Sequence, residues 1–254
     1  AASLLLWVGL RPDVGAMLIP LGVQLPAAGS AAIGIVLVYL FVLGATNSFN
    51  LLDGLDGLCG GVTVIISTAL LLLAIHLATW GFSESGDPVR LVLCLGLCGA
   101  VCGFLPFNRH PASIFMGDAG SMLLGYTVAA LMLLFAERIP RWWLASIVVC
   151  GLPILDTAVA LVRRRINRRP LFVADRGHIY DQMMDRGLSL RQTVAVCYGL
   201  AGAYALIALL MSQVRTRYAI GIYLLVVLCS AWWVKRLGFL RMSGLRGLKQ
   251  PGDR

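Results

Sequence analysis

The chain has 254 residues, of which 59% are hydrophobic and only 13% are charged, and its formal net charge is +9. A mean hydropathy of +0.85 excludes an ordinary water-soluble globular protein, because such chains carry about twice this share of charged residues. The positive charge by itself would fit a nucleic-acid partner, but its distribution along the chain argues against one.

Seven apolar stretches are long enough to cross the roughly 30 Å hydrocarbon core of a membrane as helices. They are residues 30–46, 61–80, 89–107, 120–136, 141–161, 192–211 and 217–234. Residues 1–9 are apolar but too short to span, so we expect the tail of a further helix and a chain that lacks its N-terminal helices. The sequence therefore predicts an all-α, polytopic transmembrane bundle, with about seven spans plus a partial N-terminal one, in a single integral-membrane domain over 1–254.

The basic residues gather on one side of these spans. If residues 47–60 are cytoplasmic, segments 108–119, 162–191 and 235–254 lie on the same side, and together they hold fifteen of the 21 Lys and Arg. This asymmetry is the positive-inside rule. It fixes the orientation without a nucleic-acid partner, and it predicts that 235–254 is a basic cytoplasmic tail.

The first polar segment on this side is NSFNLLDGLDGL, residues 47–58. Asn47, Asn50, Asp53 and Asp56 recur every third residue, so a helical backbone would place them along one stripe, with the two acids about 5–6 Å apart. Two carboxylates at that separation repel each other unless a cation lies near. The alternative is that these residues only cap the following helix, although capping needs one such residue and here there are four.

The second segment is FNRHPASIFMGDAGS, residues 107–121. It combines the amide of Asn108, the ring of Phe115 and the carboxylate of Asp118. Because Gly117 and Gly120 flank this acid at a predicted helix start, it is a candidate oxygen ligand for Mg²⁺. Taken alone, Asp118 also fits a simple helix N-cap.

The third segment, residues 162–191, begins with a run of arginines that fits an anchor at anionic lipid headgroups. Its later part contains Asp175, Arg176 and His178. An imidazole beside an arginine suits the oxygens of a diphosphate, although this stretch also fits an ordinary solvated loop. Asp156 lies inside the predicted span 141–161, where an acid is expected to face protein and pair with an arginine or a neighbouring helix.

Together the three segments resemble the polyprenyl-phosphate N-acetylhexosamine-1-phosphate transferase family, whose members are membrane enzymes of glycosyltransferase family 4. Residues 47–58 are similar to its Asn-x-x-Asn-x-x-Asp-Gly-x-Asp-Gly-Leu segment. Residues 108–121 are similar to its Asn-x-x-Pro-Ala-x-x-Phe-Met-Gly-Asp-x-Gly-Ser loop, and PILDT at 153–157 resembles a further family stretch. The resemblance follows nearly the whole chain in order and spacing.

The resemblance implies a role for each matching residue. It makes Asp53, Asp56 and Asp118 catalytic residues in one acidic cluster. Of these, Asp118 and Asp53 would be ligands of Mg²⁺, with Mn²⁺ as a substitute. It further implies that Phe115 stacks on uracil and that His178 acts on the diphosphate as a catalytic residue. The remaining substrate-binding residues that it implies are Asn47, Asn50, Asn108, Asp175 and Arg176.

Two features depart from the family pattern. The family's Asp-Asp-x-x-Asp motif has no equivalent between Ala1 and Asn47, so we expect the parent protein to carry it upstream. In the third segment, Tyr180 and Asp181 stand where the family often has further histidines. This second departure favours a donor simpler than the muramoyl-pentapeptide.

The resemblance implies an enzyme of a bacterial cytoplasmic membrane with its active site on the cytoplasmic face. Its partners would be a UDP-N-acetylhexosamine and a polyprenyl phosphate, and a homodimer stays open. The reaction would move N-acetylhexosamine-1-phosphate, in the first instance GlcNAc-1-phosphate, to the lipid with release of UMP. The alternatives are a membrane transporter and an inactive membrane scaffold of the same fold.

Overall fold

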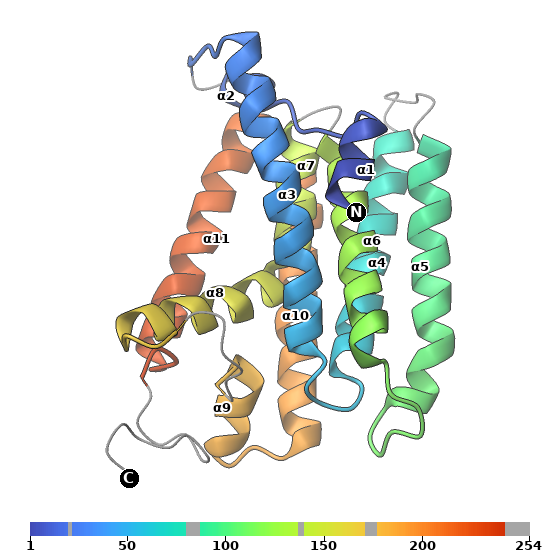
Figure 1. Ribbon diagram of the computed structural model, residues 1–254, viewed down its shortest axis with the longest axis vertical. Helices are drawn as coiled ribbons and strands as arrows, with labels where there is room; N and C mark the ends of the chain where they lie inside the picture. Colours follow the sequence, from blue (N-terminus) through green and yellow to red (C-terminus); the bar gives the residue numbers. More distant parts are fainter. Residues whose placement is uncertain (20–21, 80–86, 137–139, 171–176, 242–254) are drawn as a thin grey trace.

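The computed structural model describes residues 1–19, 22–79, 87–136, 140–170 and 177–241, and all regular structure within them is helical. Six of these helices are long and apolar enough to cross a membrane, and the number is seven if a bent pair of shorter helices is counted as one span. The six are α3 (Ala27–Leu52), α4 (Leu58–Thr79), α5 (Asp87–Asn108), α6 (Gly117–Ala136), α10 (Leu190–Ser212) and α11 (Thr216–Arg236). The prediction of an all-α polytopic membrane bundle is confirmed (Figure 1).

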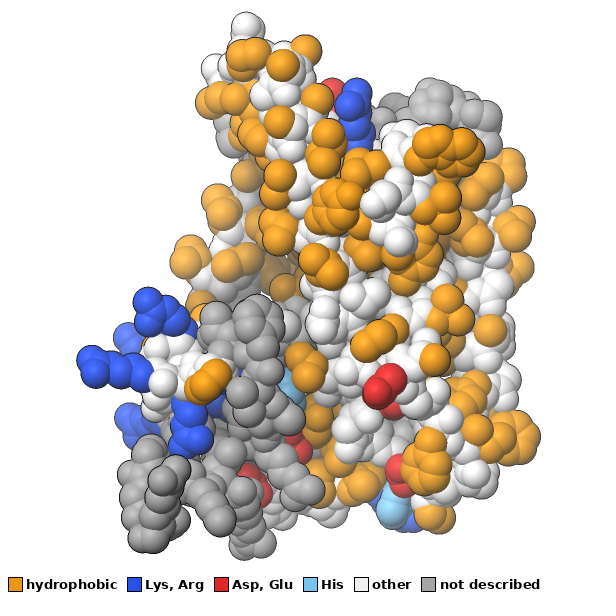
Figure 2. Space-filling view, viewed as in Figure 1, with side chains coloured by type: hydrophobic (Ala, Val, Ile, Leu, Met, Phe, Trp, Pro, Cys, Tyr) orange, Lys and Arg blue, Asp and Glu red, His pale blue; other side chains and the backbone are white. Residues whose placement is uncertain are grey.

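Helix α4 is the most buried of the six long helices. Helices α5, α7 (Pro140–Val149) and α10 all contact it. The other spans leave large apolar side chains exposed, among them Leu95 and Leu228, as expected where lipid is the solvent. Figure 2 shows these side chains over the flank of the bundle and most of the visible charged ones near one end.

The predicted span at 141–161 is not one continuous helix, because a break divides it into α7 and α8 (Gly151–Ile166), which meet at a bend of 68°. Pro153 lies in the first turn of α8, where a missing N–H is tolerated but where the hydrogen bonds of α7 cannot continue. Figure 1 shows α7 along the bundle and α8 across it. The bend turns Asp156 into the protein, where it is 1% exposed.

Three short helices complete the described chain. Helices α1 (Ala2–Trp7) and α2 (Val14–Leu18) contact α3, and the helical form of α1 agrees with the predicted partial span. Helix α9 (Ile179–Asp185) was not predicted, and it contacts α10 at the end of the bundle where the polar segments gather (Figure 1). Residues 242–254 of the predicted basic tail lie outside the described residues.

Close packing between α3 and α6 depends on Gly125. A Cβ atom at this position would lie 2.5 Å from the carbonyl oxygen of Ala45 and 2.7 Å from Cα of Thr46. Because both are backbone atoms, no side-chain movement relieves the clash. We expect Gly125→Ala to push the two helices apart and to lower the free energy of unfolding by about 1–3 kcal/mol.

Thermal unfolding in detergent measures this effect, and Gly99→Ala on α5 is the matched control. A Cβ at Gly99 has no neighbouring atom within 4 Å, so its substitution is expected to change stability by no more than about 1 kcal/mol. Equal melting temperatures for the two variants would contradict the close α3–α6 contact.

Candidate active site

The first polar segment forms the end of α3 and the turn that follows it. The predicted helical stripe holds only for Asn47 and Asn50, because α3 ends at Leu52 and Asp53 is its C-cap. Asp56 lies in the turn before α4. Asn47 donates to the carbonyl of Leu43 in its own helix at 2.7 Å, so the structure does not bring this amide into contact with the acids.

Asn50 joins the first and second polar segments. Its side-chain amide donates to Oδ1 of Asp118 and to Oγ of Ser121, both at 3.1 Å. Asp118 lies in the first turn of α6, and Ser121 is buried one turn later. Two segments almost 70 residues apart in sequence therefore meet at the same end of the bundle, as the resemblance predicts.

Asp56 forms a second link between these segments. Its Oδ2 accepts from Nδ1 of His110 at 2.9 Å and from the backbone N–H of Ala112 at 3.1 Å. The hydrogen bond from His110 is the main reason why the pKa of Asp56 lies below its ordinary range. In this arrangement Asp56 holds the second loop against the first.

Asn108 acts in the same way. It is 3% exposed, its Oδ1 accepts from the N–H of Gly57 at 3.2 Å, and its Nδ2 donates to the carbonyl of Ile114 at 3.0 Å. Both ends of the amide therefore shape the loops. Phe115 differs, because its ring is 73% exposed and offers a face on which a base could stack.

The negative charge is concentrated between Asp53 and Asp118. Burial raises the pKa of Asp53 to about 6, and the charges of Asp118 and Asp56 add to this effect. Among the described residues, no three His, Cys, Asp or Glu side chains are placed to enclose a metal ion. Two carboxylates nevertheless fit Mg²⁺, because this ion seldom takes an all-protein cage and usually completes its shell with water and substrate oxygens.

The third segment reaches this end of the molecule through His178, the N-cap of α9. The His178 side chain is 4% exposed, and its Nδ1 lies 2.6 Å from Oδ2 of Asp156. Asp156 therefore faces protein, as expected, and its partner comes from a neighbouring helix. The predicted substrate-binding residues Asp175 and Arg176 lie outside the described residues.

Several residues that contribute to this arrangement were not predicted as site residues. Arg163 and Arg164 belong to the run interpreted as a headgroup anchor, yet both are buried. Tyr180 donates to the carbonyl of Leu51 at 2.9 Å and so ties α9 to the first segment. The sequence feature that could have indicated these residues is Asp156 on α8, because a carboxylate within an apolar stretch needs a polar partner.

Comparison with known proteins supports the resemblance. Residues 1–136, more than half of the chain, match the sequence family described as glycosyl transferase family 4. The chain belongs to glycosyl transferase family 4. The matched part contains the first two polar segments and therefore Asn50, Asp53 and Asp118.

Curated relatives extend this finding. A probable undecaprenyl-phosphate N-acetylglucosaminyl 1-phosphate transferase of Bacillus subtilis (strain 168) is 36% identical over 179 residues, which is 70% of this chain and 48% of that protein. The decaprenyl-phosphate N-acetylglucosaminephosphotransferase of Mycobacterium tuberculosis (strain ATCC 25618 / H37Rv) is 32% identical over 221 residues, 81% of this chain and 54% of that protein. The chain spans about half the length of these relatives.

A relative that matches a shorter part of the chain has a different name. The phospho-N-acetylmuramoyl-pentapeptide-transferase of Limosilactobacillus reuteri (strain DSM 20016) is 35% identical over 113 residues, which is 44% of this chain and 34% of that protein. Its alignment is shorter than those of the N-acetylglucosamine-phosphate transferases. This chain of glycosyl transferase family 4 is therefore similar to the N-acetylglucosamine-phosphate transferases over a greater part of its own length than to the muramoyl-pentapeptide transferase.

Proposed function

We propose that the protein containing this chain transfers N-acetylhexosamine-1-phosphate, most simply GlcNAc-1-phosphate, from a UDP-sugar to a polyprenyl phosphate and releases UMP. The observation that carries the proposal is the meeting of Asn50, Asp53 and Asp118, from two separate segments, at one end of a membrane bundle. The names of the relatives support a polyprenyl-phosphate acceptor and a sugar-phosphate donor. We assign the reaction to the first membrane step of envelope polysaccharide synthesis.

The donor is proposed to bind across the first two segments. Asp53 and Asp118 would hold Mg²⁺, or Mn²⁺ in its place, because both supply oxygen ligands. Burial, with the charges of Asp118 and Asp56 added to it, raises the pKa of Asp53, and a bound cation would stabilise its ionised form. The bound cation would neutralise the oxygens of the diphosphate. The exposed ring of Phe115 would stack on uracil, and Asn108 would fix the loop that carries this ring.

The reaction is written as a direct displacement. A phosphate oxygen of the lipid forms a bond to the β-phosphorus of the UDP-sugar, and the bond from that phosphorus to the bridging oxygen breaks. UMP leaves with the bridging oxygen and its electron pair. The lipid phosphate is already an anion at neutral pH, so the protein's task is to position the two phosphates rather than to create a nucleophile.

Two apolar cavities beside α8 are suited to the tail of a polyprenyl lipid. One, of about 280 Å³, lies between α8 and α7, α10 and α11, and the other, of about 360 Å³, lies between α8 and α3 and α6. Ile154 and Ala158 of α8 line both. Ser48 and Thr157 in the second cavity bond to each other at 2.7 Å, so its lining remains almost wholly apolar.

A bulky side chain between the cavities is expected to weaken lipid binding. We expect Ala158→Trp to raise the KM for polyprenyl phosphate about tenfold or more, equivalent to about 1.4 kcal/mol, with little change in UMP affinity. Ala100→Trp is the matched control, because Ala100 lies on α5 away from both cavities and is exposed. Equal lipid KM values for the two variants would remove α8 from the proposed lipid site.

The proposed location is a bacterial cytoplasmic membrane with the site on the cytoplasmic face. The charges support this orientation, since the ends of α8 and α11 near the site carry Arg163, Arg164, Arg165, Lys235 and Arg236. One substrate stays in the bilayer and the other is a charged nucleotide, so a site at the interface can serve both. A homodimer remains a prediction.

The decisive experiment uses the full-length protein in membranes with polyprenyl phosphate and a panel of labelled UDP-sugars. We expect UMP release that requires Mg²⁺ and a labelled lipid product. A protein that inserts but is inert with each donor would favour the inactive scaffold. Movement of substrate across the membrane without a lipid product would favour the transporter.

A further inference from the structure

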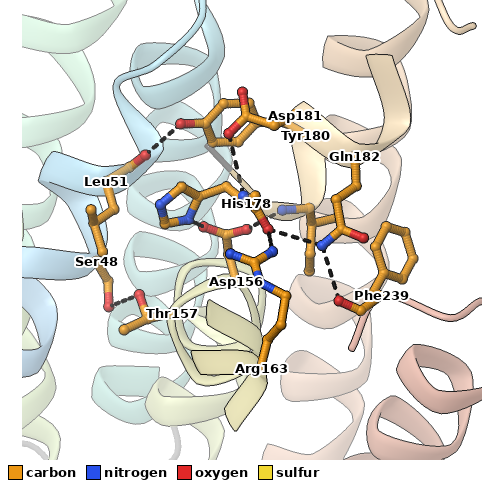
Figure 3. A network of polar contacts seen from close by, with 12 residues as sticks. Ser48, Leu51, Asp156, Thr157, Arg163, His178, Tyr180, Asp181, Gln182 and Phe239 are labelled. Carbon is orange, nitrogen blue, oxygen red and sulfur yellow. Dashed lines mark hydrogen bonds and ion pairs between the residues drawn. The ribbon is translucent and has the colours of Figure 1, made fainter. Parts of the chain in front are cut away.

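A buried polar cluster joins α8 to the start of α9 (Figure 3). Both carboxylate oxygens of Asp156 are used there, because Oδ2 lies 2.6 Å from Nδ1 of His178 and Oδ1 accepts from the backbone N–H of Ile179 at 2.6 Å. Asp156 and His178 are 1% and 3% exposed. A carboxylate removed from water in this way is stable only with such partners.

The peptide group that precedes His178 is also held by hydrogen bonds. The carbonyl of Gly177 accepts from the guanidinium of Arg163, which is fully buried on α8, and from the amide of Gln182 at 2.9 Å. Gln182 also donates to the carbonyl of Phe239 at 3.0 Å. The backbone is therefore held immediately before and immediately after the histidine, which leaves His178 little freedom.

The imidazole ring is supported on one face by Tyr180. Their rings are stacked, with centroids 5.6 Å apart and an interplanar angle of 10°, and the Tyr180 hydroxyl bonds to the carbonyl of Leu51. Leu51 is two residues before Asp53. Thr157, the residue after Asp156 on α8, donates a hydrogen bond from its hydroxyl to that of Ser48 on α3 at 2.7 Å. The ring is thus held between α8 and the stretch of α3 that leads into the acidic segment, as Figure 3 shows.

We propose that Asp156 is a positioning residue for the transfer reaction, because it holds His178 with Nδ1 toward α8 and leaves Nε2 for the phosphates of the substrates. The carboxylate can only accept a hydrogen bond, so Nδ1 must carry hydrogen and the position of the remaining ring nitrogen is set. This inference rests on the proposed function. Asp156 itself does not contact substrate.

The stability of the fold alone does not explain why residue 156 is an acid. A buried pair of this kind can often be replaced by apolar residues of similar size without loss of stability. The arrangement instead resembles the general use of a carboxylate to fix the orientation and tautomer of a functional histidine. The Asp156 carboxylate does this from α8, which a bend of 68° turns away from the direction of α7.

Asp156→Asn tests the proposal in the full-length enzyme. The asparagine keeps the size of the side chain and an oxygen for the N–H of Ile179, but its amino group faces Nδ1 of His178, so the ring hydrogen must move to Nε2. We expect kcat for UMP release to fall about 100-fold or more, with the melting temperature and the KM for the UDP-sugar nearly unchanged. In a His178→Gln background the same substitution is expected to change kcat less than about twofold.

Asp181→Asn is the matched control, because Asp181 also lies beside His178 and accepts from its backbone N–H at 3.3 Å. An asparagine there keeps an acceptor for this bond and leaves the ring untouched, so kcat is expected to stay within about twofold. Tyr180→Phe supplies a second test that does not depend on Asp156. It keeps the stacked ring but removes the bond to Leu51, and we expect kcat to fall about three- to tenfold.

Three results would overturn the proposal alone while the wild type remains active. They are normal kcat in both Asp156→Asn and Tyr180→Phe, additive losses in the Asp156→Asn/His178→Gln double variant, and a loss of kcat no larger than in the Asp181→Asn control. A wild-type protein that releases no UMP would overturn the proposed function and this inference together.

Discussion

Replacement of Asp118 by asparagine is expected to lower transfer by about 10²–10³-fold or more without preventing membrane insertion. Asp118 is exposed in the first turn of α6, so no packing depends on its charge. An asparagine oxygen can still accept the hydrogen bond from Asn50. The variant thus removes a negative charge from the proposed cation site and changes little else.

UMP release from the full-length protein in membranes measures this loss, together with the Mg²⁺ concentration that gives half-maximal activity. The matched control is Asp13→Asn, because Asp13 bonds to Ser30 near the opposite end of α3. We expect the control to retain wild-type activity and wild-type Mg²⁺ dependence. Near-normal turnover by Asp118→Asn would refute the metal assignment.

Asp53→Asn is expected to raise stability and to abolish activity at the same time. Burial and the charges of Asp118 and Asp56 raise the pKa of Asp53 to about 6, so the ionised carboxylate destabilises the metal-free fold at neutral pH. An uncharged amide of the same size removes the cost of burying this charge and the repulsion from Asp118 and Asp56. We expect the free energy of unfolding in metal-free buffer at pH 7.5 to rise by on the order of 1 kcal/mol, because solvent screens part of the effect.

The pH dependence follows from the direction of the shift. The stability gained by keeping Asp53 neutral is fully present below its ordinary pKa of 3.8 and is lost as the pH rises through about 6. The advantage of Asp53→Asn is therefore expected at pH 7.5 and absent near pH 4. Thermal unfolding at both pH values, with UMP release at pH 7.5, measures the two effects.

Asp56→Asn provides a control of opposite sign. The hydrogen bond from His110 lowers the pKa of Asp56, so its ionised form stabilises the fold above the ordinary pKa and this stability is lost as the pH falls. Removing that charge is expected to lower stability at pH 7.5. A stabilising Asp56→Asn, or a destabilising Asp53→Asn, would contradict the electrostatic arrangement of the two acids.

Much of the fold could be predicted from the sequence, because a span is a local property. A helix that crosses lipid needs a long apolar stretch whatever its neighbours are, and six such stretches appear as α3, α4, α5, α6, α10 and α11. The break near Gly151 was missed, since Pro153 is tolerated in the first turn of a new helix as well as near a kink. Helix α9 was missed because seven residues give too weak a pattern.

The candidate site could be predicted as a set of residues but not as a set of contacts. The sequence patterns around Asn50, Asp53 and Asp118, together with the family resemblance, predicted that these residues belong to one site. Neither indicated that both ends of the Asn108 amide are used in shaping the loops. Hydrogen-bond partners far apart in the chain follow from packing, and the residue type alone does not specify them.

The sequence by itself determined that this chain is an integral membrane protein. It also determined at which end of the helices the polar segments lie and to which family the chain belongs. These properties depend on composition, charge asymmetry and motif order, all of which are written along the chain. Only the tertiary structure decided that Asp156 pairs with His178 and that Arg163 is buried behind them. A bend between α7 and α8 places these groups, and an acid within an apolar stretch predicts the need for a partner without saying which one the fold will supply.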